Sequence, residues 1–171
     1  MNPSKFKIGL RFGIFTSLLS FLVGIALVYT GLTDYSGSSN GWVSTLIMGL
    51  GIYLATEAFK KETGGTMEHG EIISVSLWLG LVSGVISAVL SIIHLQMDPK
   101  LVEQAKNLAE VRLEQQNMSD EMISKNMEII DTMFQPIPLA ALVLFVTLLS
   151  VLIIGAILGF FLKKERNVFD V

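Results

Sequence analysis

The chain of 171 residues has no cysteine, only four prolines and few charges. Without cysteine it can form no disulfide framework, no thiolate metal site and no cysteine nucleophile, so cysteine usage does not indicate its redox compartment. Charged residues make up 16% of the chain and hydrophobic residues 51%, with a mean hydropathy of +0.63. A soluble domain of this size rarely combines so little charge with so much apolar surface, and the composition therefore favours a membrane protein.

Four long apolar runs account for most of the chain. A hydrocarbon core of roughly 30 Å takes about 20 apolar residues in a helix. We therefore predict four transmembrane helices, at about residues 8–32, 42–60, 71–96 and 138–163, in one membrane domain covering residues 1–171. The first run follows a basic flank, as a secretory signal would. However, it is longer than a usual signal core and lacks a convincing cleavage site, so we expect an uncleaved span.

Lysine and arginine gather at particular ends of these runs: before the first, after the second and after the fourth. The turn at residues 33–40 contains no basic residue, and the long connection between the third and fourth runs contains more acids than bases. Cytoplasmic loops carry the excess of lysine and arginine in membrane proteins. We therefore expect both termini in the cytoplasm and the long connection outside it.

The long connection, at about residues 98–135, has the pattern of two amphipathic helices. Asp98 followed by Pro99 is typical of a helix start, and this helix is expected to reach about Gln116. Ser119 can cap a second helix. The predicted fold class is thus an all-α integral membrane protein with four transmembrane helices and a helical hairpin between the third and fourth. One face of the second hairpin helix is apolar and consists of Ile123, Met127, Ile130 and Phe134.

This apolar face has two interpretations. The hairpin could cover the outer ends of its own four spans, which is what we expect, because an apolar face beside a membrane domain is usually buried by that domain. Alternatively, it could offer its methionine and isoleucine side chains to a separate protein or to lipid.

Small residues recur at helical spacing in three of the apolar runs. Helices in lipid associate through close approach of their backbones, which small residues permit. We expect these rows to pack the four spans against one another, and the alternative is homodimerisation or binding of a partner. The rows contain Gly9, Gly13 and Ser17, continuing through Ser20 and Gly24; Gly80 and Gly84; and Gly155 and Gly159.

Few ionisable residues lie within or beside the spans. Glu57 precedes Lys60 by three residues, so pairing along the helix is expected, and a buried proton carrier is the alternative. His94 lies at the outer end of the third span, where interfacial hydrogen bonding is the ordinary explanation. The cluster at residues 68–71 contains two glutamates around a histidine. Neighbouring helical residues point in different directions, which disfavours a metal site there.

The order of these features resembles the four-span inner-membrane family of Bacteroidota known as domain of unknown function 4199. The resemblance lies in the basic N-terminus, the turn Phe59–Gly65 with Gly70 after it, the Met97–Pro99 helix start, and a glycine-bearing last span closed by Lys163 and Lys164. Where an aromatic residue is expected before the glycine of the turn, this chain has His69. The resemblance implies a bacterial inner-membrane location with the topology above. It implies no activity and no functional residues.

The lack of reactive groups beside an elaborated outer segment predicts a non-enzymatic accessory or scaffold subunit, which sits in the lipid bilayer and binds another membrane protein. The alternative is a small oligomeric transporter or channel, for which Glu57 and the serines of the third span would be the polar groups. A third possibility is a lipid-modifying enzyme using Glu68, His69 and Glu71 as acid and base, but no nucleophile accompanies them. We expect no cofactor and no nucleic-acid partner.

Overall fold

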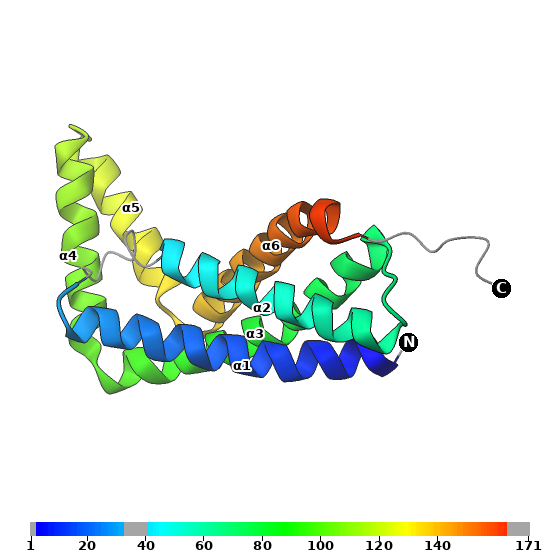
Figure 1. Ribbon diagram of the computed structural model, residues 1–171. Coiled ribbons are helices and arrows are strands. Elements are labelled where there is room, and N and C mark those ends of the chain that lie inside the picture. Colours follow the sequence, from blue (N-terminus) through cyan, green and yellow to red (C-terminus); the bar gives the residue numbers. More distant parts are fainter. Residues whose placement is uncertain (1–2, 33–40, 164–171) are drawn as a thin grey trace.

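The computed structural model describes residues 3–32 and 41–163, and these residues form six helices with no strand (Figure 1). Four of the helices are long and apolar enough to cross a membrane. The chain is therefore an all-α multi-pass membrane protein with a hairpin between its third and fourth spans, as predicted. The helices are α1 (Pro3–Tyr29), α2 (Gly41–Glu62), α3 (His69–Met97), α4 (Pro99–Gln115), α5 (Asp120–Met133) and α6 (Pro136–Leu162), of which α4 and α5 form the hairpin.

Helix α3 is the central span. It packs extensively against α1 on one side and α6 on another, and α2 packs chiefly against α1 (Figure 1). Within the described residues, α1 and α6 do not contact each other. The three other spans are therefore held together largely through α3.

The turn between α2 and α3 is tight because two glycines adopt left-handed backbone conformations. Gly64 has a φ of 75° and Gly65 a φ of 88°, which side chains with a Cβ atom rarely adopt. The Gly65 N–H donates to the carbonyl of Lys60 at 2.8 Å. Helix α3 then begins with a cap in which the carboxylate of Glu71 accepts a hydrogen bond of 3.1 Å from the N–H of Glu68. This turn holds the end of α2 beside the start of α3.

The bundle has two ends that differ in packing. We call the end where α1 and α3 begin, and where α2 and α6 finish, the terminal end. The opposite end, which carries α4 and α5, is the hairpin end. The buried apolar core lies in the terminal half of the bundle, and its side chains interlock from all four spans and the α2–α3 turn. Its members are Ile8, Ile52, Ala55, Phe59, Met67, Ile72, Val75, Leu79 and Val151.

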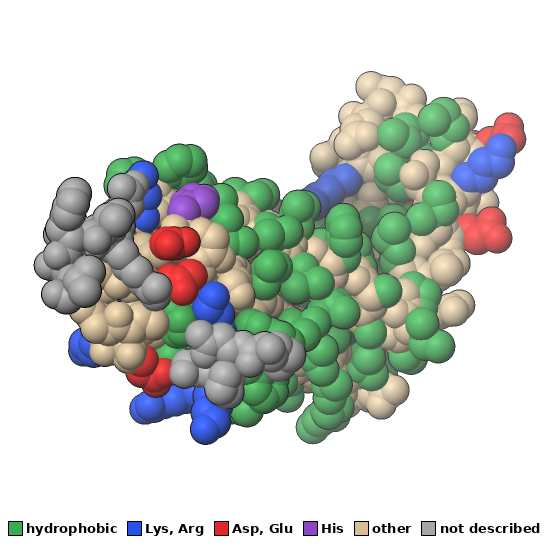
Figure 2. Space-filling model, turned by 90° about the vertical axis from the view of Figure 1, so that its right-hand side faces the viewer, with side chains coloured by type: hydrophobic (Ala, Val, Ile, Leu, Met, Phe, Trp, Pro, Cys, Tyr) green, Lys and Arg blue, Asp and Glu red, His purple; other side chains and the backbone are tan. Residues whose placement is uncertain are grey.

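The hairpin stands clear of the spans. In two views at right angles it rises beyond their outline (Figures 1 and 2). Among the described helices, α4 contacts only α3 and α5, and α5 contacts only α4 and α6. The prediction that the hairpin covers the ends of all four spans is therefore wrong for α1 and α2, because the short links at Asp98 and Gln135 direct α4 and α5 away from those helices.

The predicted apolar face of α5 is half-buried inside the hairpin. Ile123, Met127, Ile130 and Phe134 are all partly covered, and the described helices that can cover them are α4 and α6. An ion pair of 2.6 Å between the Lys106 Nζ and Asp131 Oδ1 atoms also joins α4 to α5. The face is thus used to close the hairpin on itself.

Candidate functional site

The small residues of α1 lie at a close contact with α3. A Cβ atom added at Gly13 would lie 2.8 Å from the Cβ of Val82 and 2.9 Å from the carbonyl oxygen of Leu79, which is too close for either. Gly9, one turn earlier, is equally crowded by α3, and Ser17, one turn later, is fully buried. This part of the row is used for packing within the chain.

The glycines of α3 pack in the same way against side chains of α6, and those of α6 against side chains of α3. A Cβ atom at Gly84 would lie 2.8 Å from the Leu144 side chain, and one at Gly155 would lie 2.7 Å from the Ser76 hydroxyl. Gly80 is similarly occupied by the side chain of Val151. Because these glycine surfaces are covered by the chain's own helices, they are not available to a second protein.

The polar groups considered for transport have local partners. The Glu57 carboxylate lies 3.6 Å from the Lys60 Nζ atom, which is the pairing along the helix expected from the sequence. On α3, the hydroxyls of Ser76 and Ser83 are buried and donate to carbonyl groups of their own helix, at 2.9 and 3.3 Å. These two serines lie between packed helices and do not line a pore surface.

The residues of the cluster at positions 68–71, at the start of α3, have different partners and do not converge on one site. Glu71 caps the helix and lies 3.9 Å from the Lys5 Nζ atom of α1. The His69 ring packs on α6, with its centroid 4.9 Å from that of Phe160. A Cβ atom at Gly159 would lie 2.5 Å from the Nδ1 atom of His69. Across the described part of the chain, no three His, Cys, Asp or Glu side chains are grouped as metal ligands.

The hairpin carries an apolar strip that its own chain leaves exposed. Hydrophobic side chains also show on the side of the hairpin that faces the viewer in Figure 2, with charged side chains at its outer edge. Residues 98–134 contain eight acidic and four basic residues, so the segment is negatively charged. The hairpin strip, as we name it, consists of Met122, Ile129 and Met133, which share a face of α5 because they are seven and four residues apart, and each is 45 to 55% exposed; Val111 on α4 is also 47% exposed.

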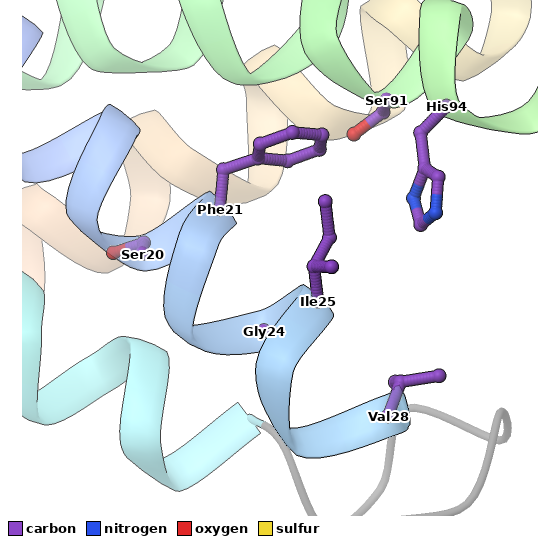
Figure 3. A pocket seen from close by; sticks show the side chains of 7 residues that line it. All are labelled: Ser20, Phe21, Gly24, Ile25, Val28, Ser91 and His94. Atoms are coloured by element: carbon purple, nitrogen blue, oxygen red, sulfur yellow. The ribbon is translucent and has the colours of Figure 1, made fainter. Parts of the chain in front are cut away.

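A cavity of about 230 Å³ opens between α1 and α3 at the hairpin end (Figure 3). The His94 ring hangs from α3 into the space beside Ile25 of α1. The Nε2 atom of His94 and the Oγ atom of Ser20 are buried and have no hydrogen-bond partner among the described residues. Most of the cavity wall is apolar, and the lining residues are Ser20, Phe21, Gly24, Ile25, Val28, Ser91 and His94.

Sequence reasoning missed this cavity. It assigned His94 to interfacial hydrogen bonding, whereas the ring is instead packed edge-on against Phe21, with centroids 5.7 Å apart and planes at 84°. One signal was available, since Ser91 and His94 are three residues apart and thus share a face of α3. What the sequence could not indicate is that α1 stays apart from α3 at this depth.

Two further cavities lie on the bundle. One of about 180 Å³ lies where the hairpin joins the spans, between α3, α4 and α6, and includes Phe134 and Gln96 in its lining. Another, of about 330 Å³, lies along α3 beside Leu148 of α6, and Ser74 is the polar residue in its lining. Neither includes a buried polar atom without a partner.

The family model described as Protein of unknown function (DUF4199) matches residues 7–164, which cover most of α1 and all the other helices. The chain belongs to this family. It is the family that the order of sequence features resembles. A search of the curated proteins and a search of the solved structures each find no match. The family description carries no activity, so a proposal about function has to start from the geometry.

Proposed function

We propose that the protein is a non-enzymatic accessory or scaffold subunit of the bacterial inner membrane, which binds the extracytoplasmic part of another membrane protein through its hairpin. The observation that carries the proposal is the hairpin strip, which leaves Met122, Ile129 and Met133 exposed on an element that stands clear of its own bundle. The placement of lysine and arginine supports a topology with both termini in the cytoplasm and the hairpin outside.

The other surfaces suited to a partner are already occupied. Rows of glycine allow neighbouring helices to approach closely in lipid, but the glycines of α3 and α6 and the part of the α1 row from Gly9 to Ser17 are covered within the chain. The exposed leucines and phenylalanines of the spans are the ordinary covering of a helix that faces lipid. An exposed apolar strip outside the membrane has no such explanation, and larger apolar patches of this kind mark interaction sites.

Charge favours a protein partner over the lipid surface. Amphipathic helices that lie on a bilayer carry lysine and arginine on their polar face, because these side chains are attracted to anionic lipids. The hairpin has twice as many acids as bases. Anionic headgroups would repel it, whereas a partner with basic residues around an apolar contact would complement it.

The partner can be tested by photo-crosslinking in native membranes. A photoreactive side chain at position 133 is expected to crosslink one membrane protein at a constant ratio. Two matched variants each introduce a carboxylate into the hairpin. Ile129→Asp lies within the strip and should abolish the crosslink. Gln104→Asp lies on the exposed surface of α4, outside the strip, and should leave the crosslink unchanged. Crosslinking only to phospholipid, only to a second copy of the chain, or equally in both variants would refute the proposal.

The topology can be tested separately because the chain has no native cysteine. Asn107→Cys on the hairpin is expected to react with a membrane-impermeant maleimide added from the periplasmic side. Lys61→Cys at the terminal end is exposed in the structure and should react only after the cells are lysed. The reverse pattern would place the hairpin in the cytoplasm and exclude an extracytoplasmic partner.

A further inference from the structure

The cavity between α1 and α3 lies outside the packed core of the bundle and extends along α1. It runs along α1 from Ser20 to Val28, which is eight residues of helix or about 12 Å. Its outer end is near the ends of the two spans, since α1 finishes at Tyr29 and α3 at Met97. The cavity therefore extends from the expected depth of the membrane interface towards the hydrocarbon region.

Two of the residues that line the cavity carry a buried polar atom without a partner among the described residues, the Nε2 atom of His94 and the Oγ atom of Ser20. A buried donor or acceptor that makes no hydrogen bond costs about 1 to 3 kcal/mol, and no bulk water is available in the hydrocarbon region to offset this. Figure 3 shows that the His94 ring projects into the open space, that Ser91 lies beside it on α3, and that Ser20 lies at the end of the lining away from His94. His94 and Ser91 are consequently the polar side chains that a molecule in this part of the cavity would meet.

The chemistry of the wall defines what fits. A neutral imidazole offers one N–H donor and one acceptor nitrogen. Around it, Phe21, Ile25 and Val28 are apolar, and none of the lining residues is acidic, lysine or arginine. A charged headgroup would lose its hydration there without gaining a counter-charge, whereas a carbonyl oxygen needs only one donor.

The space beside Gly24 completes the site. A Cβ atom added at Gly24 would have no atom within 4 Å, whereas one added at Gly13 on the same helix would collide with α3. Glycine at position 24 is thus not needed for helix contact. Its lack of a side chain keeps the cavity open.

We propose that this cavity binds a neutral membrane amphiphile whose carbonyl oxygen accepts a hydrogen bond from His94 and whose hydrocarbon part lies along Ile25 and Phe21. Two sources share this chemistry: the ring carbonyl of an isoprenoid quinone and the ester carbonyl of a phospholipid. The site is on the α1–α3 side of the spans, and the proposal does not depend on a partner at the hairpin.

The test uses the full chain in nanodiscs. Decylubiquinone is titrated in one arm while the imidazole ¹⁵N signals of His94 are followed by NMR, and phospholipid retained in detergent is counted by native mass spectrometry in the other. Saturable shifts of the His94 signals by the quinone identify the quinone source. Retention of one phospholipid that the quinone does not displace identifies the lipid source. Absence of both saturable shifts and a retained phospholipid overturns the proposal.

Three variants separate the site from general lipid contact. His94→Phe keeps an aromatic ring and removes the donor, so affinity should fall about tenfold. Gly24→Leu should abolish binding by filling the cavity, and Leu22→Phe, at an exposed position that does not line it, should leave binding unchanged. Equal binding by all three variants overturns the proposal. Because the His94 signals are recorded on the native sequence, misfolding of a variant does not remove the test.

Discussion

The same four helices are packed tightly at one end and loosely at the other. At the terminal end, Phe59 and Ile72 are completely buried and side chains from all four spans interlock. At the hairpin end, α1 and α3 separate around a cavity, and a second cavity lies at the base of the hairpin. The cavity in the terminal half lies along the partly exposed Leu77 and Leu81 of α3, outside the core. The row of small residues in α1 crosses both regions, with Gly13 pressed against α3 and Gly24 beside open space.

This difference shows that a row of small residues permits close approach of another helix but does not ensure that a helix packs there. Close approach in lipid also needs a facing side chain that fills the groove. Val82 of α3 fits against Gly13, whereas the α3 residues opposite the outer part of α1 include Ser91 and His94, which line a space instead. The function of such a residue thus depends on its partner helix.

The largest effect is expected from truncating the core of the terminal end. Phe59→Ala should lower the free energy of unfolding by about 3 to 5 kcal/mol, because it leaves a void among fully buried side chains. Phe21→Ala at the hairpin end should cost only about 1 kcal/mol, for the lost ring contact with His94. Unfolding in mixed micelles at increasing SDS measures the free energy lost in each variant. Equal losses would contradict the difference in packing between the two ends.

A smaller effect on stability is expected when glycine is replaced by alanine at one of two positions in α1. These two variants compare the two ends of the bundle most directly. Gly13→Ala should destabilise the protein by about 1 to 3 kcal/mol, because the added methyl group collides with Val82 and with the backbone of Leu79. Gly24→Ala should be neutral or stabilise by up to about 1 kcal/mol, since alanine favours helix and meets nothing. Thermal unfolding in detergent distinguishes the two. A cost at Gly24 similar to that at Gly13 would mean that α1 and α3 close on each other in solution.

The polar interactions of Glu71 at the terminal end should contribute less to the free energy of unfolding. Glu71→Ala removes both the cap on the Glu68 N–H and the pair with Lys5, and is expected to cost about 1 to 2 kcal/mol. Lys5→Ala removes the pair together with the contact of its Nζ atom over the Phe59 ring, 5.6 Å from the ring centroid, and should cost about 1 kcal/mol. Repeating the unfolding measurement at high salt should reduce the Lys5 effect and leave most of the Glu71 effect. If salt cancelled both equally, Glu71 would have no capping role.

The smallest effect is expected in the hairpin. Lys106→Met breaks the ion pair with Asp131 and should cost about 0.5 kcal/mol, because both groups are partly exposed. Amide hydrogen exchange should become faster in α4 and α5 and stay unchanged in the spans, since the hairpin makes few contacts with them. Faster exchange in α1 or α2 would show that the hairpin and the bundle are coupled.

The sequence predicted the parts of this fold that local chemistry determines. Apolar run length indicated the four spans, and the Asp98–Pro99 start and the break after Gln116 indicated a two-helix connection, which is confirmed. The direction of the hairpin was not predictable, because an amphipathic face does not specify what it packs against. Packing inside the hairpin removes the apolar surface of Ile123 and Met127 from water, just as packing on the spans would.

The cavity was beyond sequence reasoning for a different reason. A cavity is a property of the distance between two helices, and no pattern within either helix states that distance. Gly24 belongs to the same row as Gly13, and His94 occupies an ordinary interfacial position. Only the tertiary arrangement separates a glycine that permits contact from one that leaves room.

The central position of α3 has a consequence for biogenesis. Since α6 contacts α3 and α2 but not α1, and follows the hairpin in the chain, it can dock only after residues 98–135 have been synthesised. Until then, the side of α3 that contains Gly80 and Gly84 has no neighbour from its own polypeptide. During synthesis this groove is exposed to the insertion machinery and to other nascent segments, and the arrival of the last span is the event that seals it.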